Sequence, residues 1–194
     1  MKRKSEVQRK TRETDIHLTI ELNSRKTSEI RTPFAFFNHM LTAFCKYANV
    51  YVQLIANGDT DVDPHHLIED CGLVIGIGLN KALGERRGIE RYASRYVTMD
   101  DALSRVVLDI SGRAFLVYKL FLPQPIINQL DLHLFEEFFR ALCMEAKFTL
   151  HIESLYGNNS HHIIESVFKA FALCFKDAVQ VCHEDIPSTK GVIV

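Results

Sequence analysis

Alternating apolar and polar residues mark the strands that the first half of the chain is expected to contain. Residues 15–22 alternate at every position, which is typical of a strand with one buried face. A segment opened by Pro33 and rich in phenylalanine instead has the apolar spacing of a helix. Pro64 suits the first turn of a second helix, where its missing N–H is not needed. The expected elements are strands at 15–22, 28–32 (a return strand after a turn) and 51–56, and helices at 34–47 and 64–83.

The same order of elements starts again after a break at residues 84–88. The chain therefore reads as two copies of strand–strand–helix–strand–helix, and we expect half-repeats at 1–92 and 93–194 that fold as one compact unit. The expected elements of the second copy are strands at 104–108, 114–120 and 147–152, and helices at 132–146 and 160–181.

A five-residue pattern, His-His-x-x-Glu, occurs at residues 65–69 and again at 161–165, each time in a predicted helix. With nine histidines and thirteen glutamates in the chain, roughly 0.03 matches are expected by chance. Two matches half a chain apart indicate a duplicated site.

The helical spacing of this pattern favours metal binding. Positions i and i+4 share a helix face, so His65 and Glu69 can converge on one cation while His66 points elsewhere. Imidazole and carboxylate together are common ligands of first-row transition metals. The sequence therefore predicts two metal sites, each combining a His/Glu pair of one helix with the spare histidine of the other. The alternative is two helices with surface histidines.

Two further residues occupy matching places in the helices that precede the duplicated pattern. His39 lies 26 residues before His65, and Glu137 lies 24 residues before His161. The alternative for His39 alone is a buried, hydrogen-bonded core histidine, and the alternative for Glu137 alone is an exposed carboxylate on a helix face. Included as ligands, they complete two sets: His39, His66, His161 and Glu165; and His65, Glu69, Glu137 and His162.

Composition excludes several other classes of protein. A formal net charge of −1 gives no general attraction to nucleic acid or anionic membranes. The basic, polar start lacks the apolar region of a secretory signal, and the longest apolar run, 73–79, is too short to span a bilayer. Five cysteines without a Cys-x-x-Cys motif are expected to be reduced core residues of a cytoplasmic protein. Gly76 and Gly78, inside a predicted helix, are expected to serve helix packing rather than dinucleotide binding.

Short motifs distributed along the whole chain carry a family resemblance. They are Arg12-Glu13-Thr14, Phe37-Asn38-His39-Met40-Leu41, Gly58-Asp59, His65-His66, Glu69-Asp70, Gly88-Ile89, Arg91-Tyr92, Met99-Asp100, Asp109-Ile110-Ser111-Gly112-Arg113, Leu150-His151-Ile152, Gly157-Asn158, His161-His162-Ile163-Ile164-Glu165, Phe168-Lys169-Ala170 and Pro187-Ser188-Thr189-Lys190-Gly191. In this order and spacing, the set resembles the imidazoleglycerol-phosphate dehydratases of histidine biosynthesis. The largest departure is Glu137, where many members of that family have a histidine.

The resemblance implies a particular fold and assembly. The fold is α+β, a tandem pseudo-repeat of two halves of the ribosomal protein S5 domain 2-like kind. Each half is a four-stranded sheet with helices on one face, and the helices of the two halves pack together. The resemblance also implies two Mn²⁺ ions per subunit and an octahedral homo-oligomer of 24 chains, with sites at subunit contacts.

The implied reaction removes water from imidazole glycerol phosphate and leaves imidazole acetol phosphate. The carbon that loses a proton is not beside a carbonyl, so two metals holding the ring as imidazolate would supply the missing acidity. Glu13 is the expected general acid/base and touches the substrate, and Glu69 and Glu165 join it as expected catalytic residues. The phosphate site of the family maps onto Arg91, Arg113, Lys169, Ser188 and Lys190.

Two other functions remain open from the sequence. One is a noncatalytic metal-binding assembly protein and the other is a zinc hydrolase. A metal-binding shell has no need of Glu13, Arg113 or Lys190, and a hydrolase has no need of two sites matched to one ring.

Overall fold

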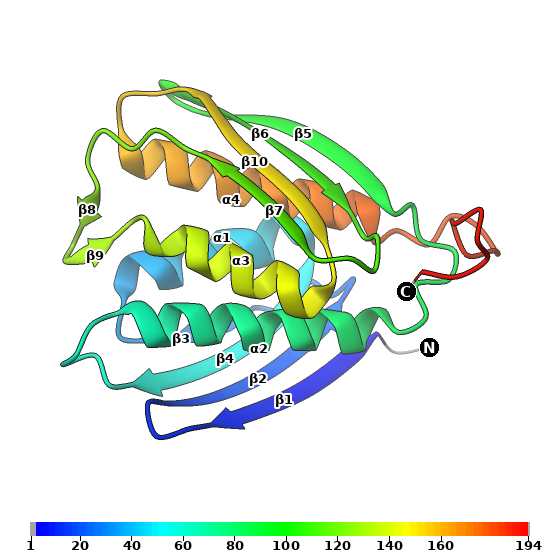
Figure 1. Ribbon diagram of the computed structural model, residues 1–194, viewed down its shortest axis with the longest axis horizontal. Helices are drawn as coiled ribbons and strands as arrows, with labels where there is room; N and C mark the ends of the chain where they lie inside the picture. The colour runs from blue at the N-terminus through cyan, green and yellow to red at the C-terminus, as the bar shows by residue number, and fades with distance from the viewer. Residues whose placement is uncertain (1–2, 194) are drawn as a thin grey trace.

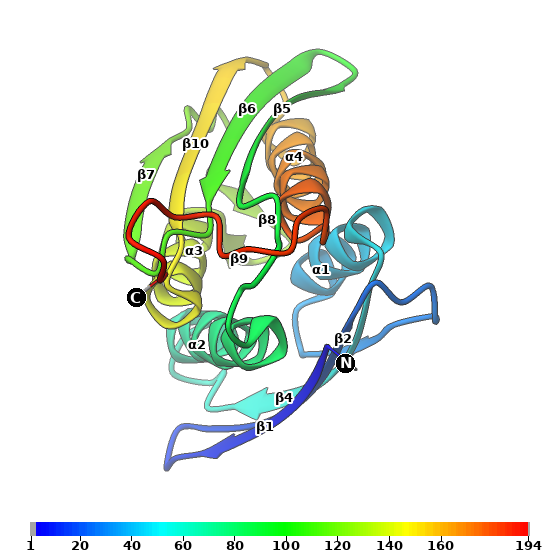
Figure 2. The ribbon, with the colours of Figure 1, turned by 90° about the vertical axis from the view of Figure 1, so that its right-hand side faces the viewer.

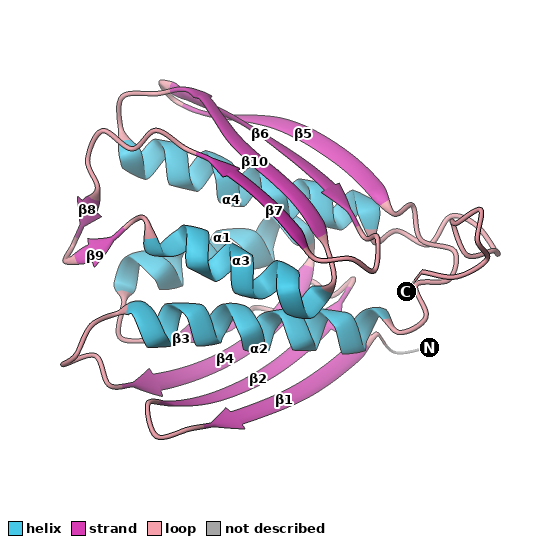
Figure 3. Cartoon of the chain, in the orientation of Figure 1, coloured by secondary structure: helices cyan, strands magenta, loops and turns pink. Residues whose placement is uncertain are grey.

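The computed structural model describes residues 3–193, with four long helices between two four-stranded sheets (Figures 1 and 3). The first half contains β1 (Lys4–Lys10), β2 (Thr14–Leu22), β3 (Glu29–Arg31), α1 (Ala35–Ala48), β4 (Val50–Gly58) and α2 (His65–Leu83). The second half contains β5 (Tyr92–Met99), β6 (Ala102–Asp109), β7 (Phe115–Lys119), β8 (Ile126–Ile127), β9 (Leu130–Asp131), α3 (Leu134–Ala146), β10 (Thr149–Tyr156) and α4 (Ser160–Ala178).

The two sheets have the same topology. Their strand orders are β1-β2-β4-β3 and β5-β6-β10-β7, and in each sheet only the last pair, β4 with β3 or β10 with β7, is parallel. Matching helices also end alike: Asn49 after α1 and Lys147 after α3 both take a left-handed conformation, with φ of 54° and 58°. The α+β pseudo-repeat expected from the sequence is confirmed.

Each sheet is covered by helices on one face only, and the two helical layers meet in the middle of the molecule (Figure 2). Helix α1 packs beside α4 and α2 beside α3, so both helix pairs join one half of the chain to the other. Aromatic side chains fill the space between these helices. Phe138 contacts Phe37 edge-on and stacks on Phe168, with ring centroids 5.3 and 6.0 Å apart, and Phe44 stacks on Phe171 at 5.1 Å.

Burial follows the sequence pattern in the central strands. In β2 the apolar residues Ile16, Leu18 and Ile20 are buried, whereas His17 between them is exposed to solvent. This alternation points one sheet face toward the helices and the other outward.

Two edge strands were not expected, and one strand pairs differently. Strands β1 and β5 complete the sheets, but inward side chains such as Val7 and Val97 are only half-buried. Charged residues occur in both strands, and Arg9 and Arg95 stand at inward positions. Sheet edges often carry such charges, which weakens the periodic signal. Residues 28–32 were expected to form a return strand, but β3 pairs in parallel with β4 and lies apart from β2.

Four of the five cysteines are buried core thiols, as expected, while Cys182 is exposed and lies beyond α4, so its expected place in the core was wrong. All five are free thiols. Within residues 3–193, no helix combines the length and apolarity required to cross a bilayer.

Candidate metal centres and anion site

Three residues of the first predicted ligand set meet at the start of α4. Potential ligand atoms of His39, His161 and Glu165 all lie within 4.8 Å of one another. His39 is in the second turn of α1, while the other two share a face of α4 as the i,i+4 spacing predicts. Nε2 of His161 and of His39 lie 3.3 and 3.9 Å from Oε2 of Glu165. Two imidazoles and a carboxylate at this spacing can hold one divalent cation.

Glu165 is the buried member of this group, whereas the two histidine side chains are 40% and 52% exposed. Burial alone would raise the pKa of Glu165, but the hydrogen bond and positive charge of Lys169 outweigh it and leave this pKa below its usual range. Lys169 Nζ donates to Oε1 at 2.8 Å, which leaves Oε2 facing the imidazoles. The ring of Phe36 packs against the ring of His161, with the two ring centroids 5.0 Å apart.

The second predicted set is not brought together within one chain. His65 and Glu69 face each other across one turn of α2, with Nε2 and Oε2 3.7 Å apart. Glu137 instead pairs with Arg140 at 3.5 Å, and His162 contacts Asp100 and Asp101. His66, assigned to the first set, contacts Asp59. Each spare histidine therefore lies apart from the set to which the sequence assigned it.

In both spare histidines, His66 and His162, a carboxylate lies within hydrogen-bond distance of Nδ1. Asp101 Oδ1 lies 2.6 Å from Nδ1 of His162, and Asp59 Oδ2 lies 3.2 Å from Nδ1 of His66. The hydrogen bond with Asp59 raises the pKa of His66, and the bond with His162 lowers the pKa of Asp101 to about 2. A carboxylate on Nδ1 fixes the neutral ring with its lone pair on Nε2, the arrangement found behind metal-bound histidines. No sequence spacing indicated this role, since Asp101 is 61 residues from its partner.

The turn between β1 and β2 brings Glu13 to the same end of the molecule. Its carbonyl accepts a hydrogen bond from the Asp59 N–H at 3.0 Å, and its negative charge contributes to the raised pKa of His66. Its own N–H donates to Thr11 Oγ1 at 3.1 Å, which fixes the turn.

The predicted phosphate-binding residues lie in a different place. An open hollow of about 890 Å³ is lined by residues of the C-terminal segment and by two loops, and its side chains include those of Arg91, Arg113, Ser188 and Lys190. Arg91 is held by Asp109 at 2.7 Å and donates to the Pro187 carbonyl at 2.7 Å. In the described part of the chain, no carboxylate lies within 4.0 Å of the charged groups of Arg113 or Lys190, so both are free for an anion. Lys169, predicted to support this site, is beside Glu165 instead.

The metal-ligand cluster and the hollow lie at opposite ends of α4. The backbone N–H of Arg91 donates to the carbonyl of Ala178, the last residue of the helix. The stretch of α4 from Glu165 to Ala178 spans roughly 20 Å at 1.5 Å rise per residue. In Figure 1 the start of α4 lies on the left, and the C-terminal segment, which lines the hollow, lies on the right.

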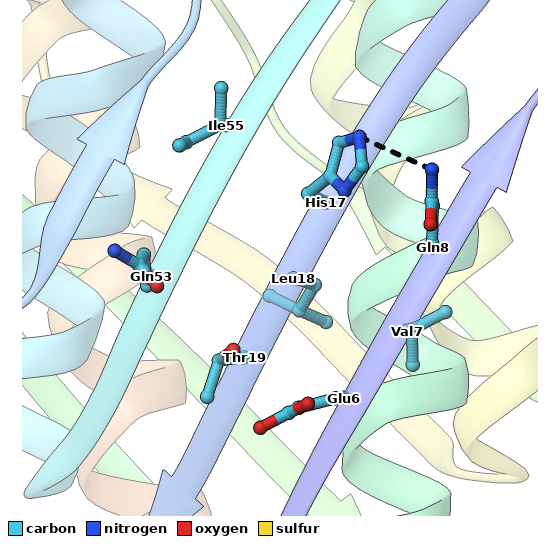
Figure 4. Close-up of a pocket in the computed structure, with 8 residues that line it drawn as sticks. All are labelled: Glu6, Val7, Gln8, His17, Leu18, Thr19, Gln53 and Ile55. Carbon is cyan, nitrogen blue, oxygen red and sulfur yellow. Dashed lines mark hydrogen bonds between the residues drawn. The ribbon is translucent and has the colours of Figure 1, made fainter.

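Another hollow, of about 460 Å³, lies on the outer face of the N-terminal sheet (Figure 4). Among the side chains around it, Gln8 and His17 approach each other with their Nε2 atoms 3.4 Å apart. It contains none of the residues that the sequence singled out.

Duplicated α+β halves, histidine–carboxylate groups and a cationic hollow are the features expected of an enzyme that uses metal ions and acts on a small anionic substrate. The family model of imidazoleglycerol-phosphate dehydratase matches residues 32–175. Curated imidazoleglycerol-phosphate dehydratases from Chlorobium chlorochromatii and Oceanobacillus iheyensis are 47% and 46% identical to the chain. These alignments cover 98% and 97% of this chain, and 97% and 98% of the relatives.

Solved structures give the same result. Imidazoleglycerol-phosphate dehydratases from Staphylococcus aureus and Pyrococcus furiosus superpose with a TM-score of 0.84, at 36% and 34% identity. The comparisons cover 92% and 96% of this chain and 99% of each of the others. The chain belongs to the imidazoleglycerol-phosphate dehydratase family and is a carbon–oxygen lyase of the histidine biosynthetic pathway.

Proposed function

We propose that the chain dehydrates D-erythro-imidazole glycerol phosphate to imidazole acetol phosphate, using two Mn²⁺ ions per subunit. The observation that carries this proposal is the cluster of His39, His161 and Glu165, whose ligand atoms fit one cation. The choice of substrate rests on the relatives, which are named as imidazoleglycerol-phosphate dehydratases.

The donor atoms present suit manganese. Imidazole nitrogen and carboxylate oxygen are ligands that Mn²⁺ accepts, and cysteine is absent from both predicted sets. His39, His66, His161 and Glu165 would hold one ion, and His65, Glu69, Glu137 and His162 the other. When bound, the two metals would supply Lewis-acid activation of the imidazole ring of the substrate.

The remaining steps use the chain's own residues. Glu13, on the turn beside Asp59 and His66, acts as general acid/base: it removes the proton from carbon or protonates the departing hydroxyl. Glu69 and Glu165 orient the histidines beside them, and Lys169 keeps Glu165 ionised. Arg113 and Lys190, with Arg91 and Ser188, bind the phosphate through charge-assisted hydrogen bonds of about 1.5–3 kcal/mol each.

The separation between the two ends of α4 supports an active site built from more than one chain. A three-carbon phosphate ester cannot bridge roughly 20 Å, so the metal-binding end of one chain must meet the hollow of another. The unassembled second ligand set supports the same conclusion, because partners for His66, His162 and Glu137 would come from neighbouring chains. We propose a closed homo-oligomer with octahedral symmetry and 24 chains, as the family resemblance implies.

The test is direct: purified protein is mixed with Mn²⁺ and imidazole glycerol phosphate, and the ketone product is measured. Metal-stripped protein should be inactive and should recover on addition of Mn²⁺. His65→Ala should abolish turnover and lower the metal content, because it removes one ligand of the second set. His17→Ala, on the outer sheet face, is the matched control and should behave like wild type. Absence of product from metal-loaded, assembled protein would overturn the proposal.

A further inference from the structure

A second kind of ligand cluster lies outside both predicted manganese sets. Glu90 precedes β5, while Cys182 and His183 follow α4, and potential ligand atoms of all three lie within 4.8 Å of one another. Cys182 Sγ is 3.0 Å and His183 Nε2 is 3.6 Å from Oε2 of Glu90. All three residues are exposed, so an ion can reach them from solvent.

The backbone holds these residues together independently of their side chains. Residues 88–90 pair with residues 180–185 through an antiparallel bridge between Ile89 and Val181. The N–H groups of Cys182 and His183 both donate to the Gly88 carbonyl, at 2.9 and 3.1 Å, and Gly88 N–H donates to Asp185 at 2.9 Å.

Gly88 allows this close approach. Its φ is +71°, and a Cβ at this position would collide with the His183 carbonyl oxygen. The two segments are thus fixed relative to each other before any ligand is present.

We infer that Glu90, Cys182 and His183 form a binding site for Zn²⁺ or a similarly thiophilic divalent cation. Zinc bonds to sulfur, nitrogen and oxygen are about 2.0–2.3 Å long, so one ion accounts for donor atoms within 4.8 Å of one another. The thiol loses its proton to solvent when the metal binds, and water takes the fourth position. Thiolate selects zinc over manganese, so this site is chemically distinct from the two predicted manganese sets.

The consequence for the molecule is a clamp on the C-terminal segment. Arg91 follows Glu90 directly and donates to the carbonyl of Pro187, which precedes the Ser188 and Lys190 of the hollow. A bound ion would tie residues 182–183 to Glu90 and so fix the segment that carries these anion-binding groups.

Cobalt(II) provides a test, because thiolate coordination gives it a near-ultraviolet charge-transfer band that nitrogen and oxygen ligands alone do not produce. Manganese-loaded protein, kept reduced, is titrated with Co²⁺. The other four cysteines are buried, so a band is expected from Cys182 alone and should be lost in Cys182→Ser. Zn²⁺ should displace Co²⁺ and protect Cys182 from alkylation, read by mass spectrometry.

Variants of the other two ligands make the test specific. Glu90→Gln and His183→Gln should each weaken Co²⁺ binding about 10-fold or more. Even residues that only hydrogen-bond to a metal ligand contribute about that much to metal affinity. Glu184→Gln, which changes a neighbouring carboxylate outside the cluster, should leave the affinity unchanged. The inference is overturned if wild type gives no band, if the band survives in Cys182→Ser, or if neither Glu90→Gln nor His183→Gln changes the affinity.

Discussion

Two histidines proposed as metal ligands, His66 and His162, each have a carboxylate within hydrogen-bond distance of Nδ1. Asp101 lies 2.6 Å from Nδ1 of His162 and also accepts hydrogen bonds from the backbone of Asn158 and Asn159, so it joins the β5–β6 turn to the start of α4. Asp101→Asn keeps the size of the side chain but removes the charge that favours the required tautomer. We expect the affinity for Mn²⁺ to fall about 10–100-fold, measured by metal titration of stripped protein.

The chain offers a matched control for this change. Asp131 lies 2.9 Å from Nδ1 of His133, an exposed histidine that belongs to neither ligand set. Asp131→Asn should leave manganese binding unchanged. Equal losses in the two variants would mean that Asp101 has no positioning role.

Two neighbouring glutamates on α3 test whether Glu137 is a metal ligand. Glu136 and Glu137 both contact Arg140, at 2.5 and 3.5 Å, and both are partly exposed. Only Glu137 occupies the position that matches His39, so Glu137→Ala should lower manganese retention after dialysis at least ~10-fold. Glu136→Ala should retain the metal like wild type. If both variants do so, Glu137 is a surface carboxylate of its helix.

At the residue scale, the sequence predicts pairs better than complete sites. The i,i+4 spacing correctly brings His161 to Glu165 and His65 to Glu69, because both members of each pair lie on one helix. The contact of His39 with this cluster also agrees with its matching place in the repeat. Asp59 and Asp101 carry no comparable signal, since loop conformation sets their contacts with the histidines. The contact of Lys169 with Glu165 does have the i,i+4 spacing, although Lys169 was predicted to support the phosphate site.

At the scale of elements, the close contact between α2 and α3 depends on glycine. A Cβ at Gly76 would lie 2.6 Å from the Leu142 carbonyl and 3.1 Å from the Ala146 nitrogen, both backbone atoms of α3 that cannot move alone. Gly76→Ala should therefore destabilise the protein by about 1–3 kcal/mol, although alanine favours the helix itself by about 1 kcal/mol. Urea unfolding at fixed protein and Mn²⁺ concentration measures the change.

Gly78 in the same helix is the comparison. A Cβ there would meet Leu18 Cδ2 at 2.6 Å, the end of a flexible side chain that can turn away. Gly78→Ala should consequently be milder than Gly76→Ala. The reverse order would show that helix–helix approach is not what requires glycine. The expected role in helix packing is confirmed for Gly76, which faces α3, whereas Gly78 faces Leu18 of β2 and so packs the helix against the sheet.

Helices and central strands are also the elements that the sequence predicts well. Their apolar positions are buried, so the regular spacing of apolar residues along the sequence is clear, as in β2 and α1. The edge strands β1 and β5 bury fewer residues and carry charges, and their period is correspondingly weak. The parallel pairing of β3 with β4 agrees with the helix between them, because neighbouring strands that are joined by a crossover helix run parallel. The expected return strand did not take this helix into account.

At the scale of the whole molecule, the end of the chain proposed to bind metal and the end proposed to bind phosphate are separated by the length of α4. If a working site combines the first end of one chain with the second end of another, defects at the two ends should complement each other. His161→Ala removes a proposed metal ligand, and Arg113→Ala removes a guanidinium group proposed to bind phosphate, so each homo-oligomer should be inactive. Co-expressed mixtures should regain activity, because some sites then combine the intact end of each chain. Mixing His161→Ala with Glu165→Gln should restore nothing, since both defects lie at the same end. A mixture of the first pair with no more activity than its separate components would mean that each chain completes its own site.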